Sequence, residues 1–514
     1  MKKAEKILCI ILTLLMLFSS VAVFTSCQPQ KTDEPGTPDA LQTSATPESG
    51  NSGESNTTTE ASLSPLEVKD FREIELAEVR MLWPEYLVNE GHFLHNELAV
   101  ENVDPSNTLD WAIYRRNMAV EDAYHVSIIV ETQKYSTIPK TVRNEFAVGE
   151  SSYGAIATVI GQMSPLALEG ALADFNDLQY YDESQEWWNH KVMQSLSITN
   201  KRYFGSGDII YSDDLYPYVV YANTGLAIQL QLGVNFYELV QEKEWTLEKF
   251  HELAVLAVAD LDGDGEVCSS LDDQYGAIDG TSFARALYYT AGKGVISLDE
   301  EGYPTWELTP GHGDEVLSKI VKALHVDNAV VDVGTKFNAK TAVEIMNLFN
   351  SDKTLFMPGD LKAAQTFTLM DNALQDFALL PMPLWEEDSE YICVMNDAVV
   401  IGVPSRFTKK DDVSLLLSAM SRASVDTLTS AFFESILTYR YLANDESVEM
   451  LNLILDSIVP RDVADIQGWG GFMQTFSRLA VDNSTDFASY YEGHIGEARA
   501  KMDAYITQLD NINT

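Results

Sequence analysis

The chain has 514 residues, of which 46% are hydrophobic and 22% are charged, a composition that excludes wholly disordered and fibrous proteins. Its 78 acidic and 34 basic side chains give a formal charge of −44. Such a surface repels phosphate backbones, which argues against nucleic acid as a partner.

Residues 1–26 have the features of an export signal. A basic head precedes an apolar run at 7–18, which is too short to span a membrane comfortably. The phrase Phe-Thr-Ser-Cys at 24–27 resembles a bacterial lipobox, so we expect cleavage of the signal and a lipid on Cys27. The alternative is a soluble secreted protein. Residues 27–66 are rich in Ser, Thr, Pro, Gly and Glu, which predicts a disordered linker.

Strand-like and helix-like segments alternate along the rest of the chain. Short apolar runs predict strands at 126–130, 155–160, 218–221, 377–380 and 398–403. Apolar residues at helical spacing predict helices at 109–124, 246–258, 414–420, 447–458 and 495–509. The alternation predicts an α/β fold with largely parallel sheets, and the length predicts two lobes. Because ligands of open α/β sheets lie beyond the carboxyl ends of strands, we expect the site in a cleft between the lobes.

One acidic segment has the spacing of a metal loop. Residues 260–273 read Asp-Leu-Asp-Gly-Asp-Gly-Glu-Val-Cys-Ser-Ser-Leu-Asp-Asp, with carboxylates at positions one, three and five and a glycine at six, as in EF-hand calcium loops. Leu271 occupies position twelve, where a carboxylate is expected. The alternative is an acidic surface turn. The predicted ligands of a structural Ca²⁺ are Asp260, Asp262, Asp264, Glu266 and Asp272.

Cysteine and histidine usage gives no sign of catalysis. Cys268 and Cys393 are the cysteines that remain after the export signal and lipid site, and we expect free buried thiols, with a bridge as the alternative. The close pair His92 and His95 lacks the glutamate of a helical zinc protease site. No nucleophile elbow, phosphate-binding loop or dinucleotide fingerprint occurs in the sequence. We therefore expect a protein that is not an enzyme.

Five phrases in one order, behind the lipobox, resemble those of the extracellular solute-binding proteins of ABC importers, in the carbohydrate-binding group that includes the maltodextrin-binding proteins. The phrases lie at 107–126, 218–223, 243–250, 354–359 and 377–383. The resemblance implies a type II two-lobed binding fold with hinge crossings near 222 and 381 and a central ligand cleft. It implies an N-terminal lobe of 67–221 plus 382–440 and a C-terminal lobe of 222–381 plus 441–514.

Several residues are candidate contacts to a solute. Trp469 stands among glycines, which we expect to leave its ring projecting, and the family has a stacking aromatic in a similar late segment. The resemblance places Phe283 and Asp360 on cleft-lining loops of the second lobe. The candidates at strand ends are Gln162, Met163, Ser164, Asn396 and Asp397. For all of these, ordinary packing or loop capping is the alternative.

The resemblance implies a binding protein without a functional cofactor, anchored by lipid on the extracellular face of the cell membrane. We expect a monomer that captures a small solute, an oligosaccharide by this resemblance, and delivers it to membrane permease subunits. Two alternatives stay open. One is an extracellular carbohydrate-active hydrolase or lyase, and the other is a ligand-sensing partner of a membrane kinase.

Overall fold

The computed structural model describes residues 73–85, 96–100, 103–104, 107–197, 199–280, 282–339, 341–367, 377–396, 398–432 and 445–513. These residues belong to one compact unit, Leu63–Thr514. The expected export signal, the lipid site Cys27, the linker and Asp397 lie outside the described residues. Within the described ranges, no helix combines the length and the apolar character that a membrane span requires.

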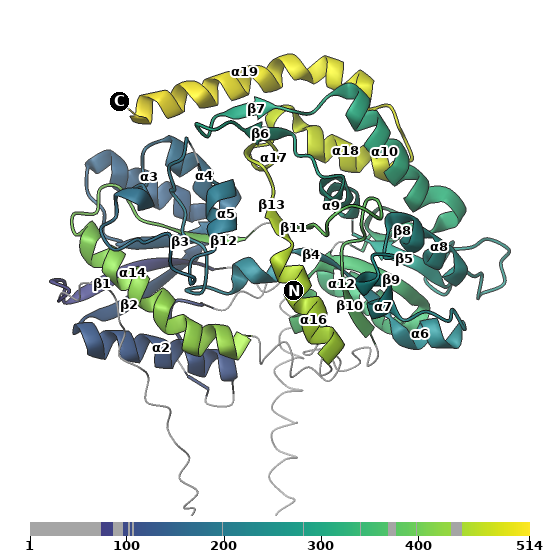
Figure 1. The fold of residues 1–514 in the computed structure, drawn as a ribbon, viewed down its shortest axis with the longest axis horizontal. Helices are drawn as coiled ribbons and strands as arrows, with labels where there is room; N and C mark the ends of the chain where they lie inside the picture. The colour runs from purple at the N-terminus through teal and green to yellow at the C-terminus, as the bar shows by residue number, and fades with distance from the viewer. Residues whose placement is uncertain are drawn as a thin grey trace, which may run out of the picture. The chain divides into compact units, whose positions relative to one another are not determined.

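The first lobe is built on a four-stranded sheet with the order β12–β3–β1–β2 (Figure 1). The strands are β1 (Glu78–Glu85), β2 (Ser127–Lys134), β3 (Ala155–Val159) and β12 (Val399–Gly402). β1 runs parallel to β2 and β3, and β12 runs antiparallel to β3. Met81 and Trp83 contribute to one apolar core, while Leu82 between them contributes to the other. Both faces of the sheet are therefore buried, as the side-chain alternation of a strand allows.

Helices cover both faces of this sheet, with α2 and α14 on one side and α3 and α4 on the other (Figure 1). Asn107 begins α2 by accepting hydrogen bonds from the backbone N–H groups of Leu109 and Asp110, at 3.1 and 3.3 Å. The helical segments are α2 (Thr108–Tyr124), η2 (Tyr135–Thr137), α3 (Ile138–Val148), α4 (Ile160–Leu168), η3 (Phe175–Asp177), α5 (His190–Ser195), η4 (Ser212–Leu215), α14 (Lys410–Ser424) and η7 (Val425–Thr429).

The second lobe is built on a five-stranded sheet with the order β10–β4–β9–β5–β8. Its strands are β4 (Tyr218–Asn223), β5 (Tyr275–Asp279), β8 (Val330–Asp332), β9 (Thr354–Asp360) and β10 (Phe377–Pro381). β5 pairs in parallel with β8 and β9, whereas β4 runs antiparallel to β9 and β10. Because β4 lies wholly in this sheet, the chain crosses between lobes before Tyr218 rather than near residue 222.

The prediction of largely parallel sheets is wrong at one strand in each lobe. β12 and β4 each run opposite to their neighbours. Each is the first strand of its sheet after the chain arrives from the other lobe. Such a strand starts at the edge that faces the other lobe, which is the edge where the parallel strands end, so its direction is reversed.

Around the second sheet lie most of the remaining helices. Thr246, the first residue of the helix predicted at 246–258, begins α8 by accepting the N–H of Lys249 at 3.1 Å. The ring of Phe356 on β9 packs 5.0 Å from Phe250 and 5.5 Å from Trp245. The segments are α6 (Thr224–Gln229), α7 (Phe236–Gln241), α8 (Leu247–Ala257), α9 (Phe283–Thr290), α10 (Pro310–His325), η5 (Val326–Asn328), α11 (Val333–Phe337), α12 (Ala342–Leu348), η6 (Phe349–Lys353), α13 (Ala363–Phe367), α16 (Asp445–Asp456), α17 (Val463–Ile466), η8 (Trp469–Gly471), α18 (Phe472–Val481) and α19 (Phe487–Asn513).

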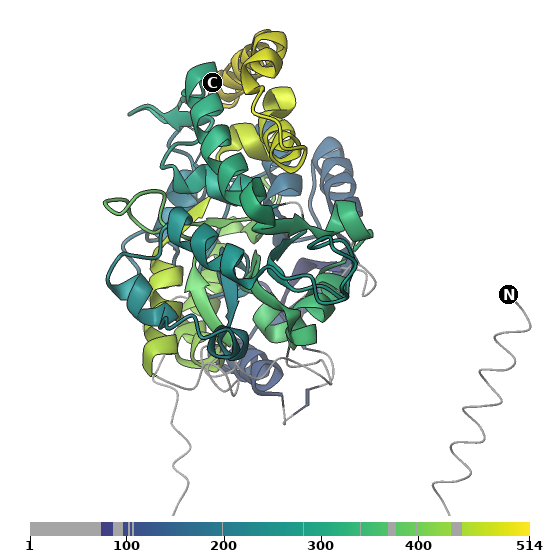
Figure 2. The same cartoon turned by 90° about the vertical axis from the view of Figure 1, so that its right-hand side faces the viewer.

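Two small sheets complete the fold. β6 (Ile296–Leu298) and β7 (Pro304–Trp306) form an antiparallel hairpin, and β11 (Cys393–Met395) pairs in parallel with β13 (Ile458–Pro460). The long helix α19 packs against α10 and η8 (Figures 1 and 2). All five predicted strands and all five predicted helices are present, and α14 and α19 extend beyond their predicted bounds.

Both cysteines of the folded part are free and buried, which confirms the prediction of free thiols. Burial raises the pKa of each thiol, Cys268 and Cys393, to about 11. Both thiols are therefore protonated at neutral pH, so neither is an activated nucleophile.

Candidate functional site

Three strands of the second sheet end at one edge with an aspartate. β5, β8 and β9 end at Asp279, Asp332 and Asp360, and β4 begins at that edge with Tyr218, which is paired with Asp360. In the first lobe, β3 ends at Val159 and α4 follows directly. Ligands of open α/β sheets lie beyond such strand ends. By this rule a solute is expected in the region between these two edges.

Polar side chains link the lobes where the chain crosses between them. Arg285 on α9 donates a hydrogen bond from Nη2 to Oδ1 of Asn396, at 2.8 Å. The backbone N–H of Asn396 donates to the carbonyl of Tyr216 at 2.9 Å. Burial raises the pKa of the Tyr218 phenol well above its ordinary value, and the carboxylate of Asp279 raises it further. The predicted contact Asn396 thus lies at the crossing, tied to the second lobe.

A cavity of about 210 Å³ lies between the lobes. Its walls combine apolar side chains, hydroxyl groups and one phenol with the side chains of Arg461 and Asp462. The first lobe contributes Ile160, Ser164, Ser195, Leu196, Ser197 and Phe204. The second contributes Ile296, Ser297, Pro304, Arg461, Asp462 and Tyr505, among others. A ring surface with nearby planar polar groups suits a polyhydroxylated solute, because its CH faces pack on the ring and its hydroxyls form hydrogen bonds.

Direct hydrogen bonds join the two lobes around this cavity. Gln467, at the end of α17, donates from Nε2 to Oγ of Ser164 on α4, at 2.6 Å. Asn200 donates from Nδ2 to the carbonyl of Glu300 at 3.2 Å, and the backbone N–H of Thr199 donates to the carbonyl of Gly302 at 3.3 Å. The tip of the β6–β7 hairpin therefore rests on the 199–200 loop of the first lobe.

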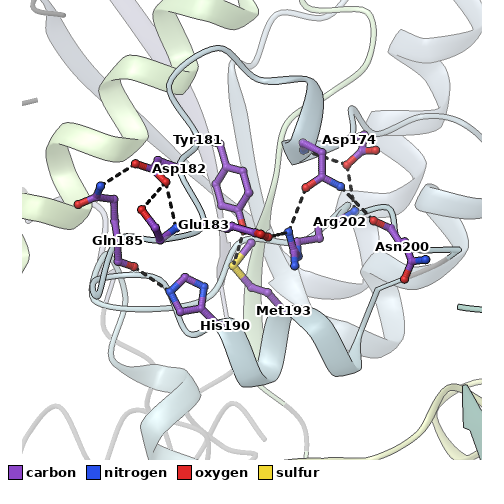
Figure 3. Close-up of polar contacts among 11 residues, drawn as sticks. Asp174, Tyr181, Asp182, Glu183, Gln185, His190, Met193, Asn200 and Arg202 are labelled. Atoms are coloured by element: carbon purple, nitrogen blue, oxygen red, sulfur yellow. Dashed lines mark hydrogen bonds and ion pairs between the residues drawn. The ribbon is translucent and has the colours of Figure 1, made fainter. Parts of the chain in front are cut away.

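The first-lobe loop that receives the hairpin is braced by its own polar network (Figure 3). The carboxylate of Asp174 accepts the backbone N–H groups of Asn176 and Arg202, both at 3.0 Å. The guanidinium of Arg202 bonds to Asn176 at 3.1 Å and forms an ion pair with Glu183. Asn176 donates from its amide to the carbonyl of Asn200 at 3.0 Å. The loop is thus held in position before the hairpin meets it.

The three predicted contacts on α4 have different surroundings. Ser164 is buried, lines the cavity between the lobes and accepts the bond from Gln467. Gln162 is half-buried. Met163 is fully buried, and its sulfur lies beside Gly402 of β12. Of the three, Ser164 is the one that the structure places on the cavity wall.

Two aromatic predictions need correction. The ring of Trp469 does not project: only 5% of the residue is exposed, and the ring packs 5.1 Å from Tyr505 on α19. Phe283 is fully buried rather than on the cleft surface, with its ring 5.3 Å from Phe250. In both cases a segment remote in sequence covers the ring. Tyr505, which shields Trp469, lines the cavity, as does Phe204 of the first lobe.

Asp360 lies at the edge of the second sheet, where the sequence predicts it. It is half-buried, and its backbone carbonyl accepts a hydrogen bond from the phenol of Tyr221 at 2.9 Å. The neighbouring Lys362 is buried, and burial lowers the pKa of its ammonium to about 8. The structure thus places Asp360 at the edge of the second sheet but not on the wall of the cavity between the lobes.

Sequence reasoning missed Tyr505, which lines the cavity, and Gln467 and Arg285, whose side chains bond to Ser164 and Asn396. Tyr505 belongs to the apolar stripe of a helix, so its periodicity signals core packing. Gln467 is adjacent to the glycine-rich segment around Trp469, and that proximity is the one local signal available. Nothing in the local sequence distinguishes Arg285 from the other arginines of the chain.

The acidic segment forms a turn whose oxygens converge. Asp260, Asp262 and Asp273 each present one carboxylate oxygen, and these oxygens lie within 4.8 Å of one another. The predicted Asp272 is not part of this group, and its carboxylate forms an ion pair with Lys353 at 3.2 Å. The predicted ligand Asp264 accepts a hydrogen bond from Oγ of Ser269 at 2.8 Å. Glu266, also predicted, is exposed.

No protein-family model matches this sequence, and no curated protein is similar to it. The structure is similar to a sugar transporter of Rhizobium etli in an open conformation, with a TM-score of 0.56 and 12% identity over 81% of this chain and 99% of that one. It is also similar to UspC of M. tuberculosis, with a TM-score of 0.54 and 14% identity over 82% of this chain and 99% of that one. A third similar structure is an ABC substrate-binding protein of Listeria monocytogenes in complex with cycloalternan. The TM-score is 0.51, and the identity is 12% over 85% of this chain and 98% of that one.

These similarities define the fold. The chain has the α/β, two-lobed fold of the periplasmic-binding-protein type, which confirms the predicted fold class. Because the sequence identities are 12–14%, these similarities support the fold and no more specific property.

Proposed function

We propose that this protein is the solute-binding component of an ABC importer, and that it captures an oligosaccharide without altering it chemically. The observation that carries the proposal is the cavity walled by both lobes, in a fold shared with proteins solved with cycloalternan or maltotetraose. Such a protein is expected to act as a monomer, tethered through Cys27 to the outer face of the cell membrane, and to deliver its solute to permease subunits.

The mechanism requires only binding and closure. A solute that contacts both walls of the cleft stabilises the form in which the lobes meet, because it makes more contacts there than in the separated form. The crossing segments act as hinges, and the hydrogen bonds of Ser164 and Asn200 to the second lobe complete the closed form. A permease that recognises the closed form then binds protein that contains the solute.

A calorimetric panel tests the proposal. The mature protein is titrated with cycloalternan, maltotetraose, monosaccharides and peptides, and each mixture is afterwards analysed for products. We expect at least one oligosaccharide to bind and to be recovered intact. In X-ray scattering, the protein with this oligosaccharide bound should have a smaller radius of gyration than the free protein. Binding of peptides alone would contradict the sugar assignment, and a hydrolysis product would contradict the binding-protein assignment.

We also propose that the acidic turn binds Ca²⁺ and stabilises the second lobe. The support is the convergence of oxygens from Asp260, Asp262 and Asp273, since Ca²⁺ prefers carboxylate and carbonyl oxygens. Burial raises the pKa of Asp273, but bonds from the N–H groups of Leu261, Ser269 and Ser270 lower it more, so its pKa lies below the ordinary value. The carboxylate is therefore charged at neutral pH, as a calcium ligand must be.

Calcium removal should lower the melting temperature. At a free Ca²⁺ concentration 100 times the Kd, binding adds about 2.7 kcal/mol to the stability, so EGTA should lower the melting temperature by several degrees. Asp260→Asn should abolish this difference. Asp272→Asn makes the same substitution outside the converging oxygens and should preserve it. Equal calcium responses of the two variants, or none in the unmodified protein, would refute the site.

A further inference from the structure

Among the described residues that line the cavity between the lobes, Arg461 is the one with a cationic side chain. It lies between β13 and α17, so the main chain of the second lobe fixes its position. The first lobe contributes the hydroxyls of Ser164, Ser195 and Ser197 to the same cavity. The side chain of Arg461 is 11% exposed, so its guanidinium is nearly enclosed where the proposed function places the solute.

The hydrogen-bond donors of Arg461 are unmet within the described part of the chain. Its Nε is buried without an acceptor, whereas its terminal nitrogens are not fully enclosed by protein. Oδ1 of Asp465 lies 3.8 Å from Nη1, which is beyond hydrogen-bond distance, and this oxygen has no donor among the described residues. Enclosed donors without acceptors are costly, so a ligand that offers acceptor oxygens to the terminal nitrogens gains binding free energy here.

The charge of Arg461, unlike its hydrogen bonds, is balanced by the protein. The carboxylate of Asp465 is fully buried beside the guanidinium, and its other oxygen accepts the hydroxyl of Tyr289 at 3.0 Å. Asp462, which lines the cavity, accepts the N–H of Val295 at 2.6 Å. Burial raises the pKa of the Asp462 carboxyl to about 6, so it is ionised at neutral pH. Two carboxylates therefore accompany one guanidinium, and the wall has no positive excess.

The charges around the cavity do not reverse this balance. Glu307 accepts the hydroxyl of the wall residue Ser297 at 2.8 Å, which adds a further carboxylate. Three basic and three acidic side chains, exposed or half-buried, flank the wall segments without lining the cavity: Lys191, Lys201, Lys293, Asp299, Glu300 and Glu301. A solute with a negative charge therefore meets carboxylates that repel it as well as the guanidinium.

We infer that Arg461 determines the specificity of this cavity by donating hydrogen bonds from its terminal nitrogens to oxygens of an uncharged saccharide. The inference rests on the proposed function and narrows its solute class to neutral saccharides. A hydroxyl or ring oxygen satisfies the unmet donors and adds no charge. A carboxylate would also satisfy the donors, but it would bring a further negative charge beside Asp462 and Asp465.

Isothermal titration of the mature protein at neutral pH tests the inference. The probes are maltotetraose, cellotriose and mannotriose, each paired with the same saccharide oxidised to carboxylates at its primary hydroxyls. We expect the best neutral saccharide to bind at least about tenfold more tightly than its oxidised form. Arg461→Met should weaken binding of the neutral saccharide about 10- to 100-fold. Arg499→Met is the control, because Arg499 is exposed on α19 and the net charge changes equally.

Asp465→Asn provides a readout that a merely structural role of Arg461 would not move. Asparagine can still accept the hydroxyl of Tyr289, but it no longer balances the guanidinium, so the oxidised saccharide should gain at least about threefold in affinity relative to the neutral one.

The outcomes separate this inference from the proposed function. Equal or tighter binding of the oxidised form, equal affinities of Arg461→Met and Arg499→Met, or an unchanged preference in Asp465→Asn would overturn the inference and leave the solute-binding assignment standing. Failure of every saccharide to bind would overturn both. Melting temperatures distinguish lost binding from lost folding, and Asp465→Asn tests the inference even where Arg461→Met does not fold.

Discussion

Replacing Arg116 with leucine is expected to lower the free energy of unfolding of the first lobe by about 3–5 kcal/mol. Arg116 is fully buried on α2, where burial lowers the pKa of its guanidinium to about 9. Its donors reach the carbonyls of Ile209, Glu97 and Leu98 at 2.9, 2.8 and 3.1 Å. Leucine fills part of the volume but leaves buried carbonyl oxygens without these donors, and each such loss costs about 1–3 kcal/mol.

The neighbouring arginine supplies the control for this substitution. Arg115 is half-buried on the same helix, and no described side chain pairs with it, so Arg115→Leu should change stability by less than about 1 kcal/mol. Arg116→Lys keeps the charge but not the planar fork of donors, and we expect an intermediate loss. Urea denaturation followed by circular dichroism measures all three variants. Equal stabilities of Arg116→Leu and Arg115→Leu would contradict the structural role given to Arg116.

Gly302→Ala is expected to separate the lobes and weaken oligosaccharide binding by about 10- to 100-fold. Gly302 has a φ of +80°, and a Cβ there would lie 2.6 Å from the backbone nitrogen of Asn200 in the first lobe. This overlap exists only while the hairpin rests on the 199–200 loop, so it destabilises the closed form alone. Overpacking of this kind costs about 1–3 kcal/mol, and 1.4 kcal/mol corresponds to a tenfold change in affinity.

Gly292→Ala isolates the effect of the backbone strain. Gly292 also has a φ of +80°, but no atom lies within 4 Å of a Cβ built there. Both alanine variants carry the cost of about 1–2 kcal/mol for a left-handed residue, and only Gly302→Ala adds the overlap between lobes. X-ray scattering should show a larger radius of gyration for Gly302→Ala alone. Identical scattering and affinity of the two variants would refute the closing role of the hairpin contact.

Local features were predictable because neighbouring residues encode them. The cap of α8 by Thr246 and the strands around Ala157 and Val220 follow from residue type and spacing over a few positions. The acidic turn was also visible, but the sequence predicted Asp272 where the structure brings the carboxylate of Asp273 beside those of Asp260 and Asp262. The choice of Asp273 over Asp272 depends on backbone bonds within the turn and on Lys353, which comes from η6.

The sequence by itself determined an α/β chain of two lobes, its alternating elements and the segments at the strand ends. Only the tertiary structure decided that Trp469 and Phe283 are buried and that Tyr505 and Arg285 face cavities. The physical reason is the distance along the chain over which the deciding contacts act: Ser164 meets Gln467 across 303 positions, and Arg285 meets Asn396 across 111. Periodicity and capping act over a few residues, so they determine which face of an element is apolar but not which distant segment covers it.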